Sequence, residues 1–144
     1  MAWGDLVFFV LSQFEFNPQF KYFEISLASL AHDLLSVAEN NRSLAYILNR
    51  FYLYHAESIG VNCSIWGDKT PVNTFYLHRI KSVFPSAKYI HLVRDGCDVV
   101  SSYVREHLYP DVQSAANRWK KSVTAAEKNR ACGTETGARV YCFR

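Results

Sequence analysis

Glycine is scarce in this sequence, and its glycines lie far apart. The 144 residues contain six of them, at Gly4, Gly60, Gly67, Gly96, Gly133 and Gly137. Only the last two are close together, and the segment between them has no basic residue and follows no predicted strand. Loops of the Walker type need several glycines and a lysine to hold phosphate between a strand and a helix. The sequence therefore argues against a nucleotide kinase or hydrolase built on such a loop.

Metal-binding and disulfide patterns are also missing. The four cysteines form no CxxC pair and no Cys/His cluster with zinc spacing. Four cysteines could form two disulfides, and Cys132 and Cys142 are the one near pair. Because cytoplasmic proteins keep their thiols reduced, we expect reduced thiols, and no bound metal. The short apolar run near the N-terminus carries Asp5 and is too short for a membrane span or a signal peptide. A cytoplasmic protein that does not contact the membrane is expected.

Charge of one sign is not concentrated anywhere along the chain. The formal net charge is only +3, and the basic residues are scattered. A nucleic-acid groove would need a clustered basic face. The sequence therefore predicts no nucleic-acid partner.

The chain has the length and apolar content of one domain. Its 144 residues are 49% hydrophobic, which is enough for one core and too little for two domains. Residues 1–22 are rich in phenylalanine without a regular period, so we expect an irregular N-terminal segment. Helical spacing predicts further helices over 23–38, 44–59, 76–84, 95–108 and 112–126. Short strands are predicted at 61–66, 89–93 and 139–144.

The order of these elements predicts an α/β fold. Strands separated by helices imply parallel pairing in a helix-flanked sheet. Three short strands make a thin sheet with free edges, which is unfavourable for an independent domain. The sequence therefore predicts part of an α/β domain, incomplete at both ends.

The stretch Ala87–Ser102 combines a strand, a tight turn and the start of a helix. The apolar run from Tyr89 to Val93 suits a strand buried on both faces. Asp95 then favours the N-cap of a helix. Ligands of open α/β sheets bind at the carboxyl ends of strands, and helix amides there favour an anion. Arg94 adds a planar guanidinium suited to phosphate, so this stretch predicts an anion site.

Together with the preceding loop, this stretch resembles a known family. The motifs are Trp66-Gly67-Asp68-Lys69-Thr70-Pro71 and Ala87-Lys88-Tyr89-Ile90-His91-Leu92-Val93-Arg94-Asp95, followed by Ser102. They are similar to those of sulfotransferases that use 3′-phosphoadenosine-5′-phosphosulfate (PAPS), in particular the bacterial branch related to heparan-type enzymes. The resemblance is strongest over 60–119. It implies a fold like that of P-loop nucleoside triphosphatases, with PAPS as co-substrate and no metal.

The resemblance implies that Arg94 and Ser102 hold the 3′-phosphate of PAPS. The spacing agrees, because a helix rises about 1.5 Å per residue and a long arginine side chain can reach back over its first turns. Simpler interpretations stay open for both residues. Arg94 forms an ion pair with Asp95 or Asp98, and Ser102 is a solvated helix hydroxyl or one that bonds back to the preceding turn. The family often has a second basic residue where this chain has Cys97.

Lys69 is the candidate catalytic residue. In the heparan-type branch a Lys-Ser/Thr-Pro element lies near the transferred sulfuryl group, where a lysine balances charge on the bridging oxygen. The alternative is a loop lysine held rigid by Pro71. The general base stays open between Glu24 and His32.

The resemblance also shows what the chain lacks. The family needs a Gly/Ser/Thr-rich basic loop for the 5′-phosphosulfate, and none of the six glycines lies in such a context. We therefore expect the middle of a sulfotransferase domain, inactive by itself. Two functions remain: sulfuryl transfer from PAPS to a hydroxyl or amine of a small-molecule or glycan acceptor, or a non-catalytic remnant. The remnant would bind adenosine 3′,5′-bisphosphate weakly or contact another protein. Homo-oligomerisation is left open.

Overall fold

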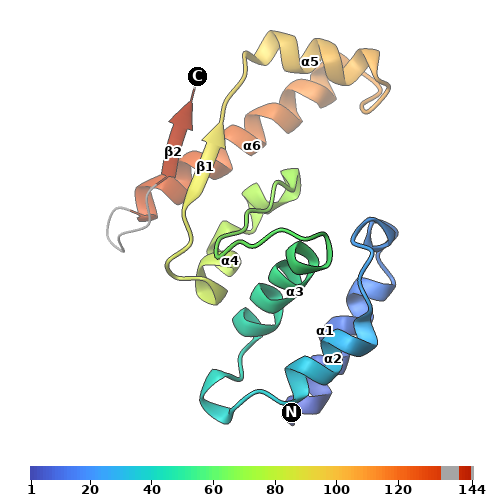
Figure 1. The fold of residues 1–144 in the computed structure, drawn as a ribbon. Coiled ribbons are helices and arrows are strands. Elements are labelled where there is room, and N and C mark those ends of the chain that lie inside the picture. Colours follow the sequence, from blue (N-terminus) through green and yellow to red (C-terminus); the bar gives the residue numbers. More distant parts are fainter. Residues whose placement is uncertain (134–139, 144) are drawn as a thin grey trace. The chain divides into compact units, whose positions relative to one another are not determined.

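The computed structural model describes residues 1–133 and 140–143, with side chains as far as residue 128. The chain divides into two compact units, Met1–Asp68 and Lys69–Arg144. Figure 1 shows the helices and strands of both units. The division falls immediately before Lys69, so Lys69, Arg94 and Ser102 all belong to the second unit.

The first unit is helical. Its helices are α1 (Trp3–Glu15), α2 (Leu27–Leu35) and α3 (Leu44–Ser58), with short 3-10 turns at Phe20–Tyr22 (η1) and Glu39–Asn41 (η2). They enclose a core in which Phe14 stacks on Phe51, with ring centroids 4.1 Å apart. The buried residues of this core are Val7, Leu11, Leu30, Ala31, Leu34, Ile47 and Phe51.

Helix α1 corrects the expectation of an irregular segment over residues 1–22. Val7 and Leu11 lie one turn apart on its buried face. Phe8 and Phe9 are 58% and 60% exposed on its other face. Because both faces are apolar, the helical period does not stand out in the sequence.

Local signals predicted α3 correctly. The hydroxyl of Ser43 accepts a hydrogen bond from the backbone N–H of Tyr46 at 3.1 Å, as expected of an N-cap. Gly60 follows the helix with a φ of 76°, which is the left-handed conformation that glycine adopts after a helix. Helix α2 is shorter than predicted, because it begins only after the Ser26 cap.

The second unit carries the predicted strand, turn and helix. Its elements are η3 (Pro71–Phe75), α4 (Leu77–Val83), β1 (Tyr89–Leu92), α5 (Gly96–Arg105), α6 (Val112–Gly133) and β2 (Val140–Phe143). Strand β1 pairs with β2 in parallel, with Tyr89 opposite Val140. Figure 1 shows the two strands side by side and α5 lying along α6.

The predicted fold class, a helix-flanked parallel sheet of the P-loop NTPase type, is wrong for the part of the chain that the structure describes. Helices predominate there, and the strands are limited to the four-residue pair β1 and β2. The predicted strand over 61–66 is not formed, and Val61 and Ile65 are 47% and 84% exposed. Without a neighbouring strand to pair with, a short extended segment gains no ladder hydrogen bonds and stays irregular.

Strand β1 also differs from the expectation of burial on both faces. Tyr89 and His91 are half-buried, but Ile90 and Leu92 are 67% and 70% exposed. Among the described residues of this unit, the only fully buried side chains are Ala115 and Ala126 of α6. The second unit therefore has a much thinner core than the first.

Candidate functional site

The candidate site is built on the connection between β1 and α5. Asp95 is the N-cap of α5, and its carboxylate accepts hydrogen bonds from the backbone N–H groups of Cys97 at 2.8 Å and Asp98 at 3.3 Å. This confirms the predicted cap. It also means that Asp95 already uses two of the amides expected to hold an anion. A bound anion would therefore depend mainly on side chains near this turn.

Arg94 lies in the three-residue connection after β1, and its side chain is exposed. The ion pair with Asp95 or Asp98, which the sequence left open, is not formed. Within the described residues, the ion-paired arginines are Arg42, Arg50 and Arg105. No carboxylate in the described part of the chain pairs with the Arg94 guanidinium, whose planar fork suits phosphate.

Ser102 and its neighbour Ser101 differ in exposure. Ser102 is half-buried, whereas Ser101 is exposed. The Ser102 carbonyl accepts the N–H of Glu106 at 2.9 Å. No hydrogen bond from its hydroxyl back to the preceding turn occurs within the described region, in contrast to Ser12 and Ser82. The assignment of Ser102 as the phosphate-binding hydroxyl stays a prediction.

Lys69 lies in the loop before η3 and is exposed. Pro71 begins η3, and the backbone N–H of Asn73 donates to the Thr70 carbonyl at 3.0 Å, so the chain just after Lys69 is well ordered. This geometry fits both interpretations of Lys69, the catalytic one and the rigid loop lysine. The catalytic role stays a prediction.

The loop before Lys69 is anchored within the first unit. The Trp66 ring stacks on Tyr52 with centroids 4.1 Å apart, and its Nε1 donates to Oδ1 of Asn49 at 2.8 Å. Burial, together with the charge of Asp68, raises the pKa of the Tyr52 hydroxyl. The Trp66–Asp68 segment is therefore fixed by packing on α3.

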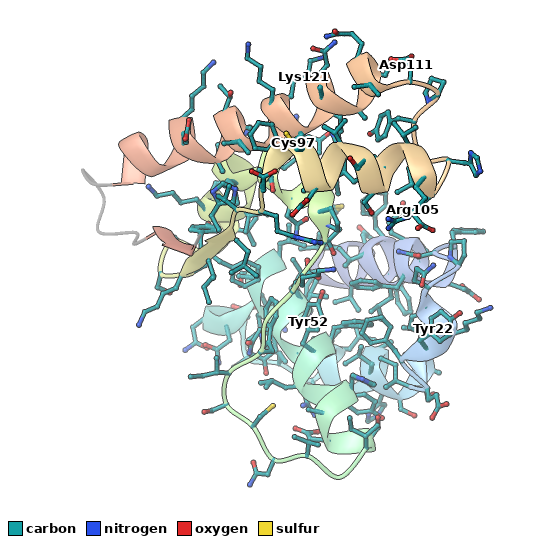
Figure 2. The ribbon with its side chains drawn as sticks, turned by 90° about the horizontal axis from the view of Figure 1, so that it is seen from above. Tyr22, Tyr52, Cys97, Arg105, Asp111 and Lys121 are labelled. Atoms are coloured by element: carbon teal, nitrogen blue, oxygen red, sulfur yellow. The ribbon has the colours of Figure 1, made fainter. Side chains whose placement is uncertain are left out.

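Two consecutive residues of α6 make contacts that the sequence does not predict. Arg118 is half-buried, with its guanidinium 4.5 Å from the ring centroid of Phe75 in η3. The indole of Trp119 packs against Gly96 at the start of α5. Lys120 and Lys121 are exposed, and Figure 2 shows Lys121 on α6. Trp119 belongs to the apolar stripe of its helix, but that stripe does not show which residue it meets.

The candidates for a general base lie in the first unit. His32 and Glu24 are both exposed, and Glu24 has a φ of 51° in the left-handed region. His55 is a structural histidine, because its Nδ1 is hydrogen-bonded to the Phe23 carbonyl oxygen at 2.7 Å. The identity of the base stays a prediction.

Cys63 and Cys97 are free thiols, and Cys97 lies in the first turn of α5 (Figure 2). The side chains of Cys132 and Cys142 fall outside the described residues. In the described part of the chain, no three His, Cys, Asp or Glu side chains are grouped to hold a metal ion. None of the described helices is both long enough and apolar enough to cross a membrane.

A family model described as "Sulfotransferase family" matches residues 13–139. The match covers most of the chain, including Lys69, Arg94 and Ser102. The chain therefore belongs to the sulfotransferase family. Comparison with curated proteins and with solved structures gives no significant match.

Proposed function

We propose that this sulfotransferase-family domain serves sulfuryl transfer from PAPS to a hydroxyl or amine of a small-molecule or glycan acceptor. In this proposal Arg94 and Ser102 bind the 3′-phosphate of the nucleotide. Bound PAPS would supply the activated sulfuryl group. Lys69 would balance negative charge that develops on the bridging oxygen.

The observation that carries the proposal is the exposed Arg94 side chain, which has no ion-pair partner among the described residues. It is exposed at the carboxyl end of β1, directly before the α5 cap, and it forms no ion pair within the described residues although Asp95 and Asp98 are close in sequence. Ser102 adds a half-buried hydroxyl two turns into the same helix. A guanidinium and a hydroxyl on adjoining elements suit a phosphate monoester better than a sulfuryl group in transit.

The 5′-phosphosulfate end of PAPS has weaker support in this chain. A Gly/Ser/Thr-rich basic loop would hold it, and the six glycines lie outside such a context. This favours a second candidate function, in which the 144-residue chain binds the 3′,5′-bisphosphate nucleotide without transferring a sulfuryl group.

Transfer of radiolabelled sulfate from PAPS to a panel of alcohols, amines and glycans separates the two functions. Binding of adenosine 3′,5′-bisphosphate without transfer above a heat-denatured control would support the second function for the 144-residue chain. Transfer that is lost in Lys69→Ala would establish the enzyme and assign Lys69. A chain that neither binds nor transfers would contradict both candidate functions.

A further inference from the structure

The start of α5 is in unusually close contact with α6. A Cβ atom added at Gly96 would lie 3.1 Å from Cη2 of Trp119 and 3.2 Å from its Cζ2 and Cζ3. Carbon atoms pack best at about 3.5–4.0 Å, so any residue larger than glycine must displace the indole or the helix. The six-membered ring of Trp119 thus lies directly against the first residue of α5.

The position of Trp119 is itself fixed by the preceding residue. The Arg118 guanidinium lies 4.5 Å from the centroid of the Phe75 ring in η3. A guanidinium over an aromatic face is attracted by the negative face of the ring, and more strongly where the cation is desolvated. Two consecutive residues of α6 therefore contact η3 and α5 at the same turn of the helix.

We propose that Trp119 is a positioning residue for the candidate nucleotide site. This inference rests on the proposed function, because its consequence concerns the affinity for the 3′-phosphate. Arg94 precedes Gly96 by two residues, and Ser102 follows it by six on the same helix. The contact between Gly96 and Trp119 therefore fixes the position of the start of α5, directly after Arg94. It also fixes the orientation of the helix that carries Ser102. An interaction that locates a binding group to a fraction of an ångström acts on affinity without touching the ligand.

A double-mutant cycle tests this role. Gly96→Ala should weaken binding of adenosine 3′,5′-bisphosphate, measured by calorimetry on the full chain, by about threefold to tenfold. Phenylalanine lacks the three indole atoms that crowd Gly96, so Trp119→Phe should restore room for the methyl group. We expect Gly96→Ala to cost less than about twofold in the Trp119→Phe background. An equal loss of affinity in both backgrounds would overturn the proposal. It would mean that the effect of Gly96→Ala on binding does not depend on the Trp119 indole.

Gly67→Ala is the matched control, because a Cβ at Gly67 meets no atom within 4 Å. It should leave the affinity unchanged. The cycle is also measured by thermal unfolding without nucleotide, which separates the two proposals. If the wild-type chain binds no nucleotide, the proposed function fails, yet Gly96→Ala should still lower the Tm more with Trp119 present than in the Trp119→Phe background. Identical shifts in Tm in the two backgrounds would show that the contact does not position α5.

Discussion

The carboxylate of Asp95 accepts a hydrogen bond from the backbone N–H of Cys97 at 2.8 Å. The two residues therefore form the cap of α5 and at the same time occupy part of the anion-binding capacity of the helix N-terminus. Because Asp95 already accepts hydrogen bonds from amides in the first turn of α5, the candidate phosphate site depends on the side chains of Arg94 and Ser102 and not on the helix N-terminus. Asp95 therefore has two separate effects, one on the stability of α5 and one on the binding of an anion.

Asp95→Asn should separate these two contributions. Asparagine caps helices as well as aspartate does, so the Tm should stay close to that of the wild-type chain. Loss of a negative charge beside Arg94 should tighten the binding of adenosine 3′,5′-bisphosphate by about twofold to fivefold. Asp95→Ala is the control, and it should lower the free energy of unfolding by about 1 kcal/mol. An asparagine variant as unstable as the alanine variant would refute the capping role.

Cys97→Lys should strengthen binding of the nucleotide. Cys97 is exposed in the first turn of α5, where the family often carries a basic residue. An added ammonium group at such a site should increase the affinity by about threefold, and the gain should diminish in high salt. Cys97→Ser, which leaves the charge unchanged, should bind like the wild-type chain. Calorimetry at two salt concentrations measures both effects, and a gain that does not respond to salt would contradict the electrostatic explanation.

The start of α6 predicts a dependence of stability on pH. The backbone N–H and the hydroxyl of Ser114 donate to the Asp111 carboxylate at 2.7 Å and 3.0 Å, and these bonds lower the pKa of Asp111 (labelled in Figure 2). Since the folded state favours the ionised carboxylate, this stabilisation is present above the ordinary aspartate pKa of about 3.9. It is lost as the pH falls through the lowered folded pKa.

Asp111→Asn retains a capping oxygen but removes the titration. The Tm of the wild-type chain should therefore fall more steeply than that of this variant when the pH is lowered from about 6 to about 3. Thermal unfolding followed by circular dichroism at several pH values measures the difference. Parallel curves for the two proteins would mean that Asp111 does not contribute to acid sensitivity.

Much of the helical structure could be predicted because its signals are local. Ser43, Gly60 and Asp95 mark the ends of their helices through hydrogen bonds and φ angles that depend on a few neighbouring residues. Helix α1 was missed, since Phe8 and Phe9 lie on its exposed face and obscure the period. The sequence also predicted more strands than the structure contains in its described part, because strand formation depends on contacts that are not local. A strand such as 61–66 depends on partners distant in the sequence, and its own pattern does not show whether they are present.

The candidate site follows the same division. The strand, the turn and the Asp95 cap were predictable from Ala87–Ser102. The approach of Trp119 to Gly96 and the stacking of Arg118 on Phe75 are contacts between elements, so no local pattern shows them. From the sequence alone, Gly96 is interpreted as a turn residue, because its contact with Trp119 is visible only in the structure.

Calorimetric titration of the chain with adenosine 3′,5′-bisphosphate is the most direct test of the Arg94–Ser102 site. We expect wild-type binding and a loss of about tenfold or more in Arg94→Ala, since hydrogen bonds to charged groups contribute about 1.5–3 kcal/mol. Ser102→Ala should cost less, because it removes a single hydroxyl donor where Arg94→Ala removes a charged group with several donors. Ser101→Ala, the adjacent exposed hydroxyl, should bind like the wild-type chain. Absence of binding by the wild-type chain, or equal affinities of wild type and Arg94→Ala, would contradict the account.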